Sequence, residues 1–363
     1  MQQYIACSFF PCSFFPYAAS SDFNDGTLPL RRSFALCLER SRFREPCART
    51  FRQDNWCGVR LLLLFIALLV FTHAGLGAAI AVGRPEQPRP TQSDIPYGPD
   101  SKNVLDFWAA AGEGPRPLLI YVHGGGWVTG DKSQKGPPFQ PFLDQGISVA
   151  AVNYRFAPQH PLPAPVHDVA RAIQFLRSQA KQWQIDTNRI ALTGPSAGAC
   201  TSMWLLLHDD LADPSATDPL LRESTRVCAA SVSVGQTSID PDIIEGWVGP
   251  NVLKHPMIAR AVGEMEIDNV IRNRDRYHAL YVEFSPINHV DSQDPPLFMT
   301  CSAEMDLPSR DAGHGIHHPI YGVKLKERSD QVGHECHLVI PGYSGSKKYK
   351  DGNDFLFQML QAK

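Results

Sequence analysis

Short apolar runs alternate with amphipathic segments along most of the chain after its first hundred residues. The runs at 118–124, 148–154 and 189–194 are almost continuously apolar and predict buried strands. Apolar residues recur at helical spacing through 166–183, which predicts a helix. The same patterns predict three more strands, at 227–235, 296–302 and 336–340, and three more helices, at 197–208, 320–331 and 351–361. Strands that alternate with helices indicate βαβ units, a mainly parallel sheet and the α/β class.

This alternation stops between about residues 236 and 290. The segment has no strand pattern, and its apolar positions are spaced as in short helices. It lies where an α/β enzyme can carry a cap over its site, so we expect a helical, cap-like insertion here.

A turn of small residues joins the third predicted strand to the helix that follows it. The turn has the pattern G-x-S-x-G, formed by Gly194, Pro195, Ser196, Ala197 and Gly198. A position between a strand and a helix is the context of a nucleophile elbow. Larger side chains at the two glycines would collide in so tight a turn, and the helix start offers free N–H groups. By itself the pattern would fit a serine that only caps the helix about as well.

A second glycine-rich motif, HGGGW, follows the first predicted strand and begins at His123. Consecutive glycines let the backbone approach a ligand closely and turn N–H groups toward it. This is the pattern of the second half of an oxyanion hole. We therefore expect the N–H groups of Gly124, Gly125 and Ala197 to face an oxyanion formed at Ser196.

With these two motifs the chain resembles the α/β-hydrolase family, in particular its esterase–lipase branch with hormone-sensitive-lipase-like and acetyl-esterase-like members. Three more stretches resemble the family. Residues 97–108 resemble its first hairpin, 153–168 the segment before its helix, and 294–308 the strand and loop of its catalytic acid. The resemblance covers roughly 95–363. It implies an α/β-hydrolase fold with a mostly parallel, eight-stranded sheet flanked by helices. It also implies hydrolysis of a small acyl or acetyl ester through an acyl-enzyme, with no cofactor and no metal.

The family's triad runs in the order Ser, Asp, His, which implies roles for residues of this chain. Ser196 takes the role of the nucleophile and Asp306 that of the acid, with Glu304 and Asp311 as close alternatives. The family's histidine lies in the loop after the last strand. That loop, at 342–348 in this chain, contains no histidine.

Other histidines are therefore candidates for the general base. His334 and His337 lie before and within the last predicted strand, and we expect structural roles for them. His314, His317 and His318 follow the expected acid on one loop, at the correct end of the sheet. They could supply a displaced base, whereas they lack the carboxylate or cysteine partners that a metal site needs.

The missing histidine leaves three hypotheses about function. The first is an exported serine esterase whose histidine has moved, or whose loop after the last strand uses another base. The second is a hydrolase-fold binding protein with impaired catalysis, because loss of a triad member leaves only residual turnover. The third is a serine peptidase, which the HGGG motif disfavours because it is typical of esterases.

Composition narrows the range of partners. The chain has 363 residues, of which 43% are hydrophobic and 20% charged, and its formal net charge is −3. These values are ordinary for a globular protein, and no long basic run indicates a nucleic-acid partner. We expect a small-molecule ester as the partner, and the sequence does not indicate an oligomeric state.

The beginning of the chain has a different composition. Residues 1–58 contain five of the nine cysteines and no periodic apolar pattern, so we expect them to be disordered or absent from the mature protein. Residues 59–81 contain Arg60, an apolar run and the small residues that end in Ala81, which is typical of a secretory signal.

This pattern predicts cleavage after Ala81 and a secreted or periplasmic protein without other stable membrane insertion. A single membrane span over 59–81 is the alternative, although the continuous apolar run is short for one. The proline-rich segment 82–94 is expected to be a linker, followed by the hydrolase domain at 95–363.

Overall fold

The computed structural model describes residues 87–134 and 136–362, and the fold is described for these residues. Eight strands form one sheet in the order β1-β2-β4-β3-β5-β6-β7-β8. The pairs β1–β2 and β2–β4 are antiparallel, and all other neighbouring strands are parallel. The strands are β1 Gln92–Pro96, β2 Val104–Trp108, β3 Arg116–Val122, β4 Ser148–Val152, β5 Ile185–Pro195, β6 Ala229–Ser233, β7 Leu297–Thr300 and β8 Cys336–Val339. The expected α/β-hydrolase architecture is confirmed.

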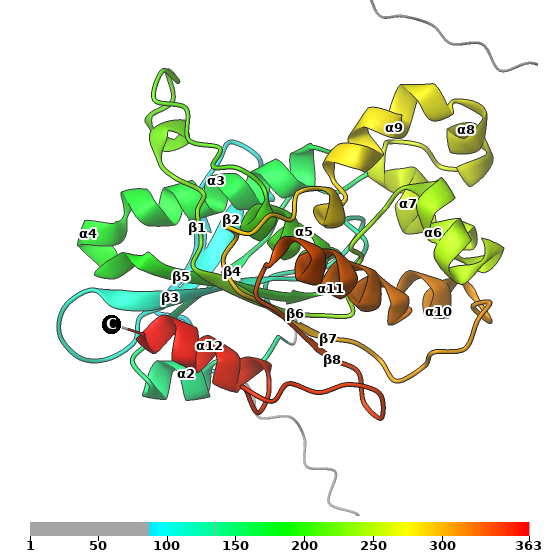
Figure 1. Ribbon diagram of the computed structural model, residues 1–363. Coiled ribbons are helices and arrows are strands. Elements are labelled where there is room, and N and C mark those ends of the chain that lie inside the picture. Colours follow the sequence, from blue (N-terminus) through cyan, green and yellow to red (C-terminus); the bar gives the residue numbers. More distant parts are fainter. Residues whose placement is uncertain (1–86, 135, 363) are drawn as a thin grey trace, which may run out of the picture. The chain divides into compact units, whose positions relative to one another are not determined.

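Helices cover both faces of this sheet (Figure 1). One face packs against α3 (Ala164–Ser178), α5 (Ala197–Leu207) and α11 (Ile320–Val332), and the other against α2 (Gln140–Asp144) and α12 (Gly352–Gln361). Short helices α4 (Ala180–Trp183), η1 (Pro219–Arg222) and α10 (Ala312–Ile316) complete this part of the chain. The expected helix at 166–183 is thus divided into α3 and α4.

The two helical layers explain why the central strands are continuously apolar and do not alternate between apolar and polar residues. In β3, Leu118, Ile120 and Val122 join the core under α3 and α5, whereas Leu119 and Tyr121 join the core under α2 and α12. Successive side chains of a strand point to opposite faces, so a strand covered on both sides buries every residue.

The segment between β6 and β7 forms the expected helical insertion. Its elements are α6 Pro241–Val248, η2 Pro250–Lys254, α7 Pro256–Ala261, α8 Ile267–Arg272, α9 Arg274–Glu283 and η3 Pro286–Asn288. Proline is the first residue of four of them, where its missing N–H costs no helical hydrogen bond. Figure 1 shows the insertion as a group of helices beside α10.

The insertion also fixes the loop between β7 and α10. The N–H of Ser309 donates to the carbonyl oxygen of Val248 over 2.7 Å, and Asn251 Nδ2 donates to the carbonyl oxygen of Ser309 over 2.7 Å. This loop carries the expected acid and leads into the three candidate histidines.

The first strand of the domain begins earlier than expected. Strand β1 starts at Gln92, three residues before the expected boundary at residue 95. Upstream of it, Gln87 Nε2 donates to the carbonyl oxygen of Pro137, and Trp108 Nε1 donates to that of Pro88. The end of the proline-rich segment is therefore attached to the domain rather than serving as a free linker. The predictions for 1–58 and 59–81 lie outside the described residues. Among the helices that are described, none has the length and apolar character that a membrane crossing requires.

Candidate active site

Ser196 occupies a strained turn between β5 and α5. Its backbone angles are φ 53° and ψ −122°, a region that residues with side chains rarely adopt. A Cβ atom on Gly194 or Gly198 would lie 2.2 or 2.1 Å from the carbonyl oxygen of Val122. The two glycines are therefore needed because β3 passes directly beside the turn, and the strain holds the Ser196 side chain above the strand ends.

The glycine-rich loop lies against this turn. A Cβ atom on Gly124 would lie 2.9 Å from the carbonyl oxygen of Pro195 and 3.4 Å from Ser196 Cβ. Gly125 has φ +107°, and a Cβ there would meet the carbonyl oxygen of Thr129 at 2.1 Å. The tight turn of the loop itself therefore requires glycine at position 125.

Several N–H groups are free beside Ser196. Ala197 is the first residue of α5, so its N–H has no partner within the helix. Within the described residues, the N–H groups of Gly124, Gly125 and Ala197 donate to no protein acceptor. These are the three groups that the sequence motifs indicated as donors to an oxyanion.

Ser196 and the glycine-rich loop line a cavity of about 640 Å³. The insertion supplies one wall through His255, Pro256 and Met257. The remaining residues come from β3, the segment after the glycine-rich loop, the elbow and the end of α10: Tyr121, Gly126, Val128, Thr129, Gln134, Pro195 and His317.

Of the three candidate histidines, His317 reaches the nucleophile. Its Nε2 lies 2.9 Å from Ser196 Oγ, and its Nδ1 lies 3.1 Å from the carbonyl oxygen of Gly313. A carbonyl oxygen only accepts, so Nδ1 carries the proton and donates to Gly313. Nε2 is then free to accept the hydroxyl proton of Ser196, which is the tautomer that a general base requires.

The other two histidines have different partners. Both are buried, with exposed fractions of 6% for His314 and 1% for His318. His314 accepts from the N–H of Arg310 and donates from Nε2 to the carbonyl oxygen of Glu304. His318 accepts from the N–H of Ile320 and donates from Nε2 to the carbonyl oxygen of Asp306. These two residues fix the loop that carries His317 and do not contact Ser196.

The expected acid is not brought to the base. The Asp306 side chain is exposed, and its carbonyl oxygen, not its carboxylate, makes the contact with His318. Glu304 and Asp311 both pair with Arg310. In the part of the chain that the structure describes, no carboxylate is hydrogen-bonded to His317. The carbonyl oxygen of Gly313, one helical turn before it, occupies that position instead.

Asp311 acts on the base indirectly. It is the N-cap of α10, and its carboxylate accepts from the N–H of His314 over 2.7 Å. This bond lowers the pKa of Asp311 below its ordinary value. Because α10 contains Gly313 and is followed directly by His317, the cap helps to hold the base in place.

Burial determines the charge state of the histidines in the cavity. The pKa of His317 is lowered from its ordinary 6.5, mainly because burial disfavours the charged ring. The bond to Gly313 opposes this shift. The pKa of His255 is lowered to about 4 by burial and by the nearby His317. Both rings are therefore uncharged at neutral pH.

Sequence reasoning did not select His255. It is the N-cap of α7, where its Nδ1 accepts from the N–H of Met257 over 3.3 Å. The one signal in the sequence is a histidine immediately before Pro256 in the insertion, a pattern of a helix start.

The histidines near β8 have structural contacts, as expected. His334 contacts Ser329 Oγ and the carbonyl oxygen of Pro295, and His337 contacts Glu335. The loop at 342–348 supplies no residue to the site cavity.

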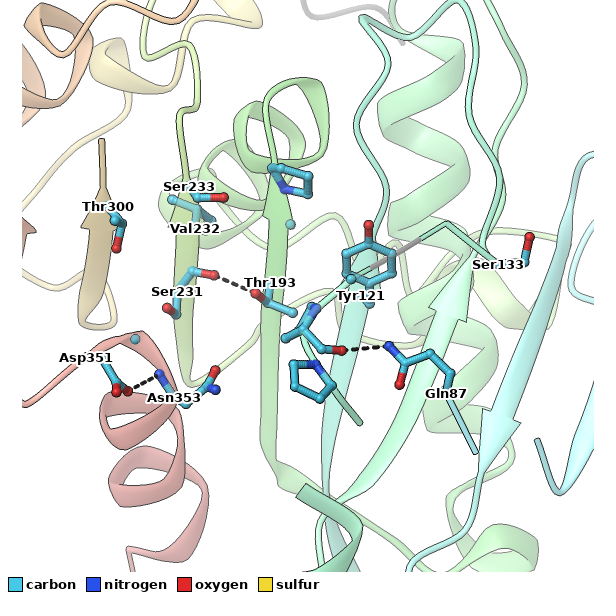
Figure 2. Close-up of a pocket in the computed structure, with 16 residues that line it drawn as sticks. Gln87, Tyr121, Ser133, Thr193, Ser231, Val232, Ser233, Thr300, Asp351 and Asn353 are labelled. Atoms are coloured by element: carbon cyan, nitrogen blue, oxygen red, sulfur yellow. Dashed lines mark hydrogen bonds between the residues drawn. The ribbon is translucent and has the colours of Figure 1, made fainter. Parts of the chain in front are cut away.

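A second cavity, of about 900 Å³, lies on the face of the sheet that packs against α2 and α12. Figure 2 shows hydroxyl side chains from three neighbouring strands around it, among them Thr193, Ser231 and Thr300. Ser196 and His317 are not among the residues that line it. The paired nucleophile and base place the candidate active site in the smaller cavity.

Comparisons with known proteins fit this geometry. The BD-FAE family model matches residues 105–306, which is more than half of the chain. Two curated relatives from Mycobacterium tuberculosis (strain ATCC 25618 / H37Rv) are named probable carboxylic ester hydrolase LipM and esterase LipC. The first is 28% identical over 211 residues, 57% of this chain and 46% of its own. The second is 31% identical over 207 residues, 56% of this chain and 48% of its own. The chain thus spans about half the length of these relatives.

Solved structures share the fold at low sequence identity. A truncated carbohydrate esterase from gut microbiota has a TM-score of 0.57 at 21% identity, over 71% of this chain and 89% of its own. Esterase 2 of Thermogutta terrifontis, phosphonylated by sarin, has a TM-score of 0.53 at 20% identity, over 76% and 92%. At these identities the likeness concerns the fold alone.

The contact between His317 and Ser196 predicts a pH dependence of any serine-dependent reaction. The neutral ring accepts the proton and the charged ring does not, so activity should rise with pH through the pKa of His317. Because that pKa is lowered, the midpoint should lie below 6.5, with a plateau at neutral pH.

His317→Ala should lower kcat/KM by about three or more powers of ten. His278→Gln, which changes an exposed histidine of α9 outside the site cavity, is the control and should keep the pH profile. A profile that His317→Ala leaves unchanged would exclude the histidine as the base.

The carboxylates of the β7–α10 loop should differ in effect. Asp306→Asn should change kcat by no more than about threefold, because its carboxylate does not touch the base. Asp311→Ala should lower kcat several-fold, because the N–H of His314 loses its capping acceptor and the base is then held less firmly. Asp311→Asn, which keeps a capping oxygen but not the charge, should restore most of the activity. A loss of about 10⁴-fold in Asp306→Asn would instead show that Asp306 serves as the acid.

Proposed function

Because the chain belongs to the BD-FAE family, we propose that it hydrolyses a carboxylic ester by nucleophilic attack of Ser196. The observation that carries the proposal is the 2.9 Å contact between Ser196 Oγ and His317 Nε2, in the tautomer that accepts a proton. The names of the relatives, which are esterases and carboxylic ester hydrolases, support the same reaction class.

The proposed reaction has two steps. In the first, His317 Nε2 takes the proton of Ser196 Oγ, Oγ attacks the acyl carbon, and the imidazolium then protonates the departing alcohol oxygen. In the second, His317 takes a proton from water, the hydroxyl attacks the acyl-enzyme, and Ser196 leaves with the proton. The negative charge on the acyl oxygen in both steps would be stabilised by the N–H groups of Gly124, Gly125 and Ala197.

The carbonyl oxygen of Gly313 performs part of the task of a carboxylate. It fixes the ring orientation and the tautomer of His317, and loss of the correct tautomer accounts for much of the cost when an acid is removed from a triad. A neutral carbonyl stabilises the imidazolium less than a carboxylate would. We therefore propose an active enzyme whose rate constant is below that of a complete triad.

The absence of a carboxylate beside His317 in the described residues favours one alternative, a hydrolase-fold binding protein with residual turnover. The intact elbow, the free N–H groups and the serine–histidine contact favour the enzyme.

Hydrolysis of p-nitrophenyl acetate by the full-length protein tests the proposal. The parent should release p-nitrophenol at a rate that falls by about three or more powers of ten in Ser196→Ala. Ser202→Ala, a serine of α5 outside the site cavity, is the matched control and should keep the parent rate. If Ser196→Ala and the parent cleave the ester equally fast, the binding-protein alternative holds.

A further inference from the structure

We propose that His255 recognises the alcohol part of the ester by donating a hydrogen bond from Nε2, so that the enzyme prefers alcohols with an oxygen atom near the ester oxygen. This inference rests on the proposed ester hydrolysis and adds a specificity-determining residue to it.

The protonation of His255 is set by the helix that it caps. Nδ1 accepts from the N–H of Met257, so in the neutral ring the proton must be on Nε2. Burial and the neighbouring His317 keep the ring neutral, with a pKa of about 4. His255 is therefore a fixed, uncharged donor at neutral pH.

The donor has no protein partner. Within the described residues, Nε2 of His255 makes no hydrogen bond, although the side chain lines the same cavity as Ser196. Its chain neighbours in the cavity wall are Pro256 and Met257, whose side chains offer no acceptor stronger than the weakly accepting thioether sulfur of Met257. A ligand oxygen in the cavity is the kind of group that would satisfy this N–H.

The position of His255 indicates which part of the ester it meets. Its ring centroid lies 6.3 Å from that of His317, with the rings at 78°. In the proposed reaction His317 protonates the alcohol oxygen, so the alcohol part must lie beside His317. A substituent on that alcohol would then pass His255, whereas the acyl oxygen is directed to the glycine-rich loop.

Two esters of nearly the same shape separate this role from a general effect on catalysis. In methoxyethyl acetate an ether oxygen replaces one methylene group of butyl acetate, three atoms from the ester oxygen. The full-length parent should be compared with His255→Asn, because asparagine is a good N-cap and keeps an acceptor for the N–H of Met257 while losing the distant donor. His278→Asn is the control, since His278 lies on α9 of the same insertion with an exposed side chain and outside the site cavity.

In His255→Asn the ratio of kcat/KM for methoxyethyl acetate to that for butyl acetate should fall by about 3- to 10-fold relative to the parent. The loss in His255→Asn should be larger with methoxyethyl acetate than with butyl acetate, and the melting temperature should stay close to that of the parent. His278→Asn should keep the parent ratio. The intrinsic reactivities of the two esters cancel in this comparison.

An unchanged ratio would overturn the proposal and leave His255 as a helix cap only. Equal losses with both esters would also overturn it, because the side chain would then act on the reaction rather than on the alcohol. If the parent cleaves neither ester in a Ser196-dependent way, the proposed function itself fails and the inference falls with it.

Discussion

The proposed chemistry depends on one hydrogen bond, between Ser196 Oγ and His317 Nε2. This bond connects two parts of the chain that are 121 residues apart. Each partner is held by a separate constraint. Ser196 is held in a strained turn, which can lie directly beside β3 only because the residues two before and two after it are glycines. His317 is held at the end of α10 by the Asp311 cap, by the carbonyl oxygen of Gly313, and by a loop fixed to the helical insertion.

The orientation of the base shows how a backbone group can replace a side chain. A carboxylate beside a catalytic histidine fixes the tautomer, orients the ring and stabilises the imidazolium. The carbonyl oxygen of Gly313 supplies the first two effects through a 3.1 Å contact and supplies the third only weakly. In the arrangement that we propose, the base lies directly after α10 instead of in the loop after β8, and no carboxylate is required at Asp306.

The fold and half of the site could be predicted from the sequence. The strand patterns gave the parallel sheet, and the G-x-S-x-G and HGGG motifs gave Ser196 and the N–H groups of Gly124, Gly125 and Ala197. For the general base, the sequence left three candidates, His314, His317 and His318. Successive residues of a helix point about 100° apart, so the residue at which α10 begins decides which histidine faces Ser196. Asp306 was expected as the acid because it follows the strand at 296–302, in a stretch that resembles the family's catalytic-acid loop. His255 was missed because its role depends on the position of α7 within the insertion, which no local pattern encodes.

Covalent labelling of Ser196 by a fluorophosphonate, followed by intact mass spectrometry, tests the central claim most directly, because the reaction needs the nucleophile and its base but not turnover. The account predicts that the parent is labelled once at Ser196, that the labelling rate rises with pH through a midpoint below 6.5, and that His317→Ala slows labelling by several powers of ten. Labelling of Ser196 that is equally fast in His317→Ala, or absent from the parent, would contradict the account.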